Sequence, residues 1–477
     1  MHSACKPACK MQPSSFIYFH DRGYTGLFMT ERKHAVKGRR LLFALLLLLL
    51  SASSSFADMK ADYGVDLRLR YEYWKGVFDM GTLKLEDENF GRLKTSFWGR
   101  LDINEHSGAY LRISSEPRYY ISSSSPDNES FEQDEIFFES LYVDVKNAAG
   151  LPVDLRIGRQ DLQYGDGFLI YDGAPVTSDR TKYFNAAKAT WKISRNTSID
   201  FVYIYNTMTD RLLPVIHPSK TGRFYKDNKR ILTSSDEEAF VLYGRRRIGE
   251  SFTIEPYYIY KRENKIDLNN PELELNTIGG RAVCNSYPWQ LKGEYARQFG
   301  QYKGGRKRKG TGGNVFVGRS LGGVMWKPGI EAGYVYMSGD DPGSKANESW
   351  DPLFSRYRWI SGLYKYAFSR ETGIGSYWTN LALYRISVLL NFTPATKLSL
   401  AYNYLRANEQ TKITGPFAAI FSNKGKERGH LQQVLLSHEF NKGIRSLLIF
   451  EYFKPGNFYS KSAGDASYLA LMVQIGL

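Results

Sequence analysis

Two kinds of residue in this chain could do covalent chemistry: a serine in a tight glycine motif and a pair of histidines. Gly318-Arg-Ser-Leu-Gly322 matches the G-x-S-x-G pattern of serine hydrolases. That pattern requires a strand-to-helix turn of an α/β sheet, which the flanking sequence does not predict. His430 and His438 share parity on one predicted strand, yet eight extended residues separate them by about 26 Å. The sequence therefore predicts neither a catalytic triad nor a zinc site, and we expect no catalytic residue and no cofactor.

An acidic loop could bind a cation. Asp340-Asp-Pro-Gly is followed by Glu348 and Asp351, and carboxylate and backbone oxygens are ligands that Ca²⁺ accepts. A plain acidic turn explains the same residues, and we favour it. Asp340 and Asp341 are therefore only a weak calcium candidate, and no metal site is predicted.

Basic residues recur on the polar face of short alternating segments. In residues 66–73, Leu67 and Leu69 share one face, whereas Arg68 and Arg70 share the other. If the segments close into a barrel, such side chains converge on one lumen, where guanidinium groups attract carboxylates and space them along a path. The alternative is that they merely pair with nearby acids such as Asp66, Glu72 and Asp102. We favour an anion pathway, whose candidates are Arg68, Arg70, Lys94, Arg100, Arg112, Arg156, Arg385 and Arg406.

The elements that must position these residues are strands. Apart from one short stretch near the N-terminus, no run of about 18 apolar residues occurs, which excludes a helical membrane bundle. Tyr and Trp often stand at segment ends, as in the aromatic girdles of membrane barrels; in a soluble sandwich, the alternative, they would be core. Alternation predicts strands at 66–73, 93–104, 109–115, 141–146, 153–157, 199–205, 252–260, 289–295, 330–336, 381–390, 398–404, 431–440, 444–453 and 468–477.

The connectors have two lengths. Those at 195–197, 394–396 and 441–443 are short. Short turns on one side and long loops on the other are typical of outer-membrane barrels, with the short turns in the periplasm and the long loops outside the cell. We predict an all-β fold: one transmembrane antiparallel up-and-down β-barrel spanning 58–477. The long polar connectors are 117–135, 209–237, 262–277, 300–313, 338–356, 407–429 and 454–465.

The N-terminus is typical of a secreted protein. Lys37-Gly-Arg-Arg40 precedes ten apolar residues and Ser51-Ala-Ser-Ser-Ser-Phe-Ala57. This is the order of a signal peptide, with cleavage expected after Ala57. A transmembrane anchor is the alternative, but about ten residues span only half of a bilayer core. Residues 1–57 are thus predicted to be an N-terminal extension and signal peptide, with Met29 a more usual start.

Charge and cysteine content limit the partners. Removing residues 1–57 removes eight Lys/Arg and two Asp/Glu and lowers the formal charge from +15 to about +9. In a secreted strand-rich protein this excess indicates anionic envelope components or an anionic solute rather than nucleic acid. Arg306-Lys-Arg-Lys309 fits an outer loop near lipopolysaccharide phosphates. Cys284 is the only cysteine after residue 57, which excludes an intramolecular disulfide framework.

Several stretches of the chain resemble the alginate-export outer-membrane porins. They include Leu155-Arg-Ile-Gly-Arg-Gln-Asp-Leu-Gln-Tyr-Gly-Asp-Gly167 preceded by Phe138-Glu-Ser-Leu-Tyr-Val-Asp144, Ser338-Gly-Asp-Asp with Trp350-Asp-Pro-Leu-Phe354, and Glu451-Tyr-Phe-Lys-Pro-Gly-Asn-Phe-Tyr459. The resemblance covers essentially the whole chain after residue 57. It implies an 18-stranded barrel with an electropositive, arginine-lined constriction that a few carboxylates gate.

The resemblance also implies further site residues. By the family motifs these are Arg159, Asp166 and Arg180. Thr181-Lys-Tyr-Phe-Asn-Ala stands where the family tends to show Arg-Arg-Ser-Phe-Asp-Gly, so part of the basic lining is replaced. We expect Arg159 and Asp166 to lie near the constriction, paired or bridged, one setting anion preference and the other limiting it.

The function expected from the sequence is passive passage through an outer-membrane channel of a Gram-negative-type bacterium. The solute is an anionic polysaccharide such as alginate, or a smaller anion, and export is the expected direction. The expected partners are the lipid bilayer, lipopolysaccharide, the anionic solute and periplasmic export components, and no nucleic acid. The alternative is an outer-membrane enzyme with a filled barrel.

Overall fold

A computed structural model describes residues 59–76, 87–122, 131–132, 135–171, 183–218, 224–227, 232–265, 271–355, 360–410, 412–413 and 417–477. The signal peptide expected in residues 1–57 lies outside these ranges. Within them, the chain forms one sheet of 22 strands. Short helical turns are η2 (Ala148–Gly150), α2 (Lys365–Thr372) and η3 (Ala418–Ile420). In the described residues, no helix is long and apolar enough to span a membrane.

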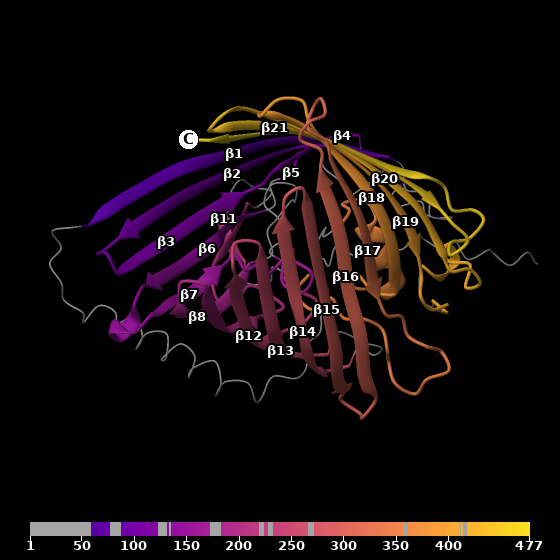
Figure 1. The fold of residues 1–477 in the computed structure, drawn as a ribbon, viewed down its shortest axis with the longest axis horizontal. Helices are drawn as coiled ribbons and strands as arrows, with labels where there is room; N and C mark the ends of the chain where they lie inside the picture. The colour runs from indigo at the N-terminus through magenta and orange to yellow at the C-terminus, as the bar shows by residue number, and fades with distance from the viewer. Residues whose placement is uncertain are drawn as a thin grey trace, which may run out of the picture. The chain divides into compact units, whose positions relative to one another are not determined.

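Eighteen of the strands form a closed antiparallel barrel, as predicted. Figure 1 shows them following one another in chain order, and β1 pairs with β22, with Asp66 opposite Gly476. The wall strands are β1 (Lys60–Lys75), β2 (Glu88–Asp102), β3 (Ser107–Ser115), β6 (Ile136–Val145), β7 (Val153–Gln160), β8 (Phe184–Ser194), β9 (Thr197–Asn206), β12 (Glu237–Ile248), β13 (Phe252–Glu263), β14 (Leu273–Ser286), β15 (Trp289–Tyr302), β16 (Lys307–Ser320), β17 (Gly329–Met337), β18 (Leu381–Asn391), β19 (Thr396–Arg406), β20 (Glu427–Asn441), β21 (Ile444–Pro455) and β22 (Ala466–Gly476).

Four shorter strands lie within the connections. β4 (Arg118–Ser122) pairs with β2 and with β5 (Phe131–Glu132). β10 (Val215–Pro218) pairs with β11 (Phe224–Asp227) and with the start of β6. The start of β6 lies beyond the reach of β7, whose pairing with β6 covers residues 141–145. β10 therefore extends the wall where β7 has ended.

Alternation separates an outer from an inner face. In β1, Leu69 is 60% exposed, whereas Arg70 next to it is 1% exposed. Successive side chains of a strand point to opposite faces, and the lipid face of a membrane barrel is apolar. Leu69, Leu93 and Phe97 thus lie on the outer face, and Arg70 lies on the inner face.

The loops are asymmetric, with one correction to the prediction. Most connections on one side are short, such as residues 195–196 and 442–443, and those on the other side are mostly long. The exception is the predicted long loop at 300–313. There β15 and β16 pair as far as Gln301 and Lys307, leaving a tight turn. Gly300 and residues 307–313 of the predicted loop are strand residues, because β14, β15 and β17 pair with them, and residues 303–306 form the turn.

Two connections fold into the barrel. The β7–β8 connection begins at Asp161, and the β17–β18 connection runs from 338 to 380 and contains α2. They meet where the backbone N–H of Phe354 donates to the carbonyl of Leu169 at 3.0 Å and the Ser355 hydroxyl donates to the carbonyl of Gly167 at 2.6 Å. We call residues 338–380 the lumen loop and residues 161–171 the companion loop.

Candidate permeation pathway

The inner wall carries a band of ion pairs that runs from strand to strand. Asp144 of β6 is directly opposite Arg156 of β7, and Arg156 is directly opposite Lys188 of β8. The Arg156 guanidinium donates to both oxygens of Asp144, at 2.7 and 3.0 Å. Lys188 Nζ lies 2.8 Å from Asp200 Oδ2 of β9. Because each pair joins neighbouring strands, the band follows the circumference of the lumen.

The band continues along the following strands as far as β17. Arg245 of β12 lies 2.8 Å from Glu255 of β13, and Arg281 of β14 lies 2.7 Å from the other oxygen of Glu255. Lys292 of β15 is 3.5 Å from Glu331 of β17. We call the cations Arg156, Lys188, Arg245, Arg281 and Lys292, together with their acidic partners, the ion-pair band.

In this band the acids are generally more buried than the bases. The side chain of Arg245 is 57% exposed against 4% for Glu255. The same order holds for Arg156 against Asp144, at 38% and 17%, and for Lys188 against Asp200, at 27% and 13%. A solute in the lumen therefore meets guanidinium and ammonium groups first, although the charges are paired in number.

Asp166 is the clearest exception to this order, and Glu331, at 27% against 24% for Lys292, is a slight one. Asp166 lies in the companion loop, its side chain is 41% exposed, and it contacts Arg281 at 3.0 Å and Lys292 at 3.6 Å. The adjacent Gly165 has a φ of +54°, and a Cβ added there would lie 2.7 Å from the Arg281 side chain. Glycine therefore permits the close approach that brings this acid to the band.

We predict that Asp166→Asn raises the preference of the pore for anions. The change removes the exposed negative charge beside Arg281 and Lys292, so about a twofold rise in the chloride-to-potassium permeability ratio is expected. The reversal potential of a planar bilayer in a KCl gradient measures this ratio. Glu274→Gln, which removes an exposed acid on the outer face of β14, is the control. An unchanged ratio in Asp166→Asn would contradict the assignment.

The companion loop is fixed to the wall by stacked tyrosines. Tyr164 stacks on Tyr243 of β12, with ring centroids 4.3 Å apart, and Tyr243 stacks on Tyr257 of β13. Burial raises the pKa of the Tyr164 hydroxyl, so it stays protonated and donates to Asp200 at 2.8 Å. The loop that carries Asp166 is thereby held against the ion-pair band.

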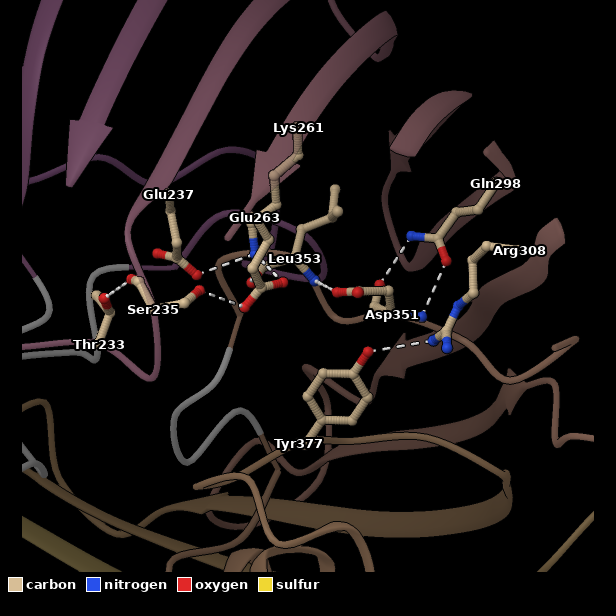
Figure 2. A network of polar contacts seen from close by, with 10 residues as sticks. All are labelled: Thr233, Ser235, Glu237, Lys261, Glu263, Gln298, Arg308, Asp351, Leu353 and Tyr377. Atoms are coloured by element: carbon tan, nitrogen blue, oxygen red, sulfur yellow. Dashed lines mark hydrogen bonds and ion pairs between the residues drawn. The ribbon is translucent and has the colours of Figure 1, made fainter. Parts of the chain in front are cut away.

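The lumen loop is tied to one side of the wall by inward polar side chains (Figure 2). Lys261 of β13 donates to the carbonyl of Leu353 at 3.4 Å and lies 2.9 Å from Glu237. Gln298 of β15 exchanges two hydrogen bonds with the backbone of Asp351, at 2.8 and 2.9 Å. Figure 2 also shows Arg308 of β16, which donates to the Tyr377 hydroxyl at 3.1 Å.

Side chains of β20 and β21 and of the connection after β21 also hold the lumen loop. Arg428 of β20 forms a bidentate pair with Glu371 of α2, at 2.7 and 2.9 Å. Glu451 of β21 accepts hydrogen bonds from the backbone N–H groups of residues 362 and 363. The buried hydroxyl of Tyr364 bonds that of Tyr459 at 2.8 Å, and burial raises the pKa of both. The lumen loop is therefore attached to β13, β15 and β16 on one side and to β20 and β21 on the other.

Three predicted site residues lie on the inner face but are buried. Arg68 lies 3.0 Å from Glu116, Arg70 lies 2.6 Å from Glu72, and Lys94 lies 2.5 Å from Glu139. Arg92, which the sequence analysis did not single out, joins the same cluster through Glu72 at 3.2 Å. Of their acidic partners, Glu72 lies in β1, Glu139 lies in β6 and Glu116 lies in the β3–β6 connection.

Arg100, Arg112, Arg156 and Arg385 are inward and partly exposed. Arg385 of β18 donates to the amide oxygens of Asn403 and Gln433, at 2.9 and 2.8 Å. Its described partners are therefore neutral. The prediction that Arg406 lines the lumen is wrong. Arg406 has the parity of the exposed Leu400 and Tyr402, so it lies on the outer face at the end of β19. Arg180 lies outside the described residues.

The prediction for Arg159, that it lies at the constriction paired with Asp166, also needs correction. The Arg159 guanidinium forms a bidentate pair with Asp210 at 2.7 and 2.8 Å and donates to Asn185 and to the carbonyl of Phe138, each at 3.0 Å. The Arg159 side chain is fully buried. Asp166 pairs with Arg281 and Lys292 instead. The expected pairing of these two residues is wrong, although each is paired with another residue.

The motifs considered for chemistry have structural roles. Ser320 ends β16, with no helix after it, so the hydrolase pattern has no structural support. His430 contacts Tyr402 and His438 contacts Thr396, both on the outer face. Asp340 contacts Arg306, and Asp341 accepts the N–H of Gly343. In the described part of the chain, no group of three or more acid, histidine or cysteine side chains could hold a metal.

Sequence reasoning missed most of the ion-pair band. Parity could have identified Lys188, Arg245, Arg281 and Lys292 if the strands that carry them had been recognised in full. Glycines on the outer face, such as Gly280 and Gly313, hide the apolar half of the pattern. The inward cations that hold the lumen loop were missed for a different reason, since their partners are far away in sequence.

A closed barrel with a charged inner face and an apolar outer face defines an outer-membrane channel. The chain belongs to the alginate export family, whose profile, described as "Alginate export", matches residues 59–472. No curated protein matches the chain.

Solved structures with the same fold come from Pseudomonas aeruginosa. OccK2 (OpdF) is 10% identical with a TM-score of 0.54, covering 88% of this chain and 98% of its own. OccK5 (OpdH) is 14% identical with a TM-score of 0.52, covering 87% and 98%. OccK2 in complex with glucuronate is 10% identical with a TM-score of 0.52, covering 88% and 98%. At these identities the likeness concerns the fold.

Proposed function

We propose that this channel passively conducts an anionic solute, an anionic polysaccharide such as alginate or a smaller anion, with export as the direction. The observation that carries the proposal is the order of burial in the ion-pair band, where the acids of three pairs lie closer to the wall than their bases. Weak contacts at several fixed cations let an anion move from one to the next, whereas a single tight site would retain it.

Two findings from the comparisons support the choice of solute. The family description names alginate export, and alginate is a polymer of sugar acids. A channel with the same fold was solved with glucuronate, which is itself a sugar acid. Both chemistries place carboxylates where lumen arginines can bind them in bidentate fashion.

The test is removal of the exposed charges of the band. In the triple variant Arg156→Gln, Lys188→Gln and Arg245→Gln, we expect the chloride-to-potassium permeability ratio to fall to about unity or below, because the acids remain. The matched control is Lys307→Gln with Lys309→Gln, two exposed cations on the outer face of β16. A wild-type pore without anion preference, or a triple variant that keeps it, would refute the proposal.

Lipopolysaccharide and periplasmic export components are proposed as partners from the two ends of the barrel that they would meet. Lys307 and Lys309 stand above an outer face with Val315 and Val317, at the end of the barrel that carries most of the long loops. With the long loops outside the cell, these lysines face lipopolysaccharide phosphates. Periplasmic export components would meet the short-turn end, and cleavage after Ala57 would deliver the barrel to the outer membrane.

A further inference from the structure

A tryptophan lies on the inner wall between two arginines of the lumen. Trp98 of β2 shares the inward parity of Arg100, whereas the neighbouring Phe97 is exposed on the outer face. In the strand register, Trp98 is opposite Arg112 of β3 and Gly64 of β1. A Cβ on Gly64 would lie 2.7 and 2.8 Å from Cζ2 and Cε2 of the indole. The ring therefore lies across the glycine with one face against the wall.

The other face of the indole is left to the lumen. Trp98 is half-buried, and none of the described rings or cations stacks on it. Most exposed aromatics of the wall lie on the outer face, as Phe97 and Tyr295 do, and inward aromatics such as Tyr243 and Tyr257 stack on other rings, unlike Trp98. Trp98 is also only a few residues from the β2–β3 turn at 103–106. It therefore stands near the short-turn mouth of the lumen.

Two arginine–aspartate pairs, Arg100 with Asp102 and Arg112 with Asp66, lie beside Trp98 on the inner face. Arg100 Nε donates to Asp102 Oδ1 at 2.9 Å, which leaves both of its terminal nitrogens available. Arg112 contacts Asp66 at 2.9 Å through Nη2 and donates to the Tyr110 hydroxyl at 3.1 Å through Nε. A guanidinium has five N–H donors and a carboxylate about four acceptor sites, so both pairs retain capacity for a ligand.

This combination fits a sugar ring better than a simple anion. The C–H face of a pyranose is apolar and covers an indole, while its hydroxyls both donate and accept hydrogen bonds. A chloride or phosphate ion gains nothing from contact with the aromatic face, because that face carries negative partial charge. We propose that Trp98, with Arg100 and Arg112, forms a subsite that recognises the pyranose ring of an acidic sugar. The proposal rests on the proposed function, since it places the solute in this lumen.

The experiment measures block of single-channel current by oligogalacturonate added at the short-turn side. We expect Trp98→Leu to raise the concentration for half-block about threefold to tenfold, which corresponds to about 0.6–1.4 kcal/mol of lost binding free energy. Phe97→Leu, which changes the adjacent side chain on the lipid face, is the matched control and should leave the block unchanged. Open-channel conductance and the heat-dependent electrophoretic mobility of the folded barrel verify that both variants fold.

The outcomes separate this inference from the anion-channel proposal. Trp98→Leu keeps every charge, so its chloride-to-potassium ratio should stay at the wild-type value while block by oligogalacturonate weakens. Arg112→Gln should weaken block by oligogalacturonate more than block by neutral malto-oligosaccharide, whereas Trp98→Leu should weaken both. Unchanged block by either oligosaccharide in Trp98→Leu would overturn the subsite. A wild-type pore without anion preference that still shows Trp98-dependent block would overturn the proposed function alone.

Discussion

Replacing residues 340–378 with a short glycine-serine linker is expected to raise single-channel conductance severalfold. The replaced segment contributes Trp350, Phe354, Phe368 and Trp378, all buried within the barrel. An 18-stranded wall without such a filling encloses an aqueous channel. The deletion is feasible, because the backbone N–H of Asn380 already donates to the carbonyl of Ser338 at 3.1 Å. The ends of β17 and β18 are thus adjacent.

The measurement is planar-bilayer conductance of the folded variant beside the wild type. A second variant tests the attachment of the loop instead of its volume. Arg428→Met should leave Glu371 buried without its bidentate partner and make the lumen loop susceptible to protease, while Glu371→Met with Arg428→Met should restore much of the resistance. Equal conductance in the linker variant and the wild type would show that the lumen loop does not limit flow.

The fold was predictable because membrane barrels follow one simple rule. In β1, charged residues alternate with Leu67, Leu69 and Tyr71. A strand needs this alternation when lipid lies on one side of the wall and water lies on the other. The rule failed where the outer residue is glycine or small. Gly280 of β14 shares the outer parity of Ile278, but a glycine cannot mark an apolar face. Strands β8, β12, β14 and β16 were therefore not recognised.

The alternation of β19 also predicts the face of Arg406. Leu400, Tyr402 and Arg406 are two and four residues apart in β19, so they must share a face. The exposed Tyr402 identifies that face as the outer one. Strand alternation alone thus excludes Arg406 from the lumen.

Burial within the lumen could not be predicted. Arg68 and Arg70 are inward, as their alternation indicated, yet Glu116 from the β3–β6 connection pairs with Arg68 and approaches Arg70 at 3.8 Å. Lys261 similarly meets Leu353, which is 92 residues later in the chain. Alternation specifies the face of a side chain, but the course of a long connection depends on contacts between distant segments. The division between exposed and covered arginines therefore required the structure.

Arg159 gives the largest expected loss of stability. The Arg159→Met variant should lose about 3–5 kcal/mol, because it leaves Asp210 as an uncompensated buried charge. Both side chains of this pair are at most 1% exposed. Gly158, with a φ of +132°, turns the chain here, and a Cβ at that position would lie 2.2 Å from the carbonyl oxygen of Leu141. The pair thus fixes the β9–β12 connection over the end of β7, which is a structural role.

Urea unfolding of the detergent-solubilised barrel measures the effect, and Arg159→Met with Asp210→Leu should recover most of the loss because no charge is left unpaired. Arg156→Met is the matched control three residues earlier. Its pair with Asp144 is partly exposed, so stability should change little, while the anion preference of the pore should fall. The folded fraction of Arg159→Met should keep wild-type selectivity. A stable Arg159→Met protein with altered selectivity would instead return Arg159 to the permeation pathway and contradict the role assigned to its pair with Asp210.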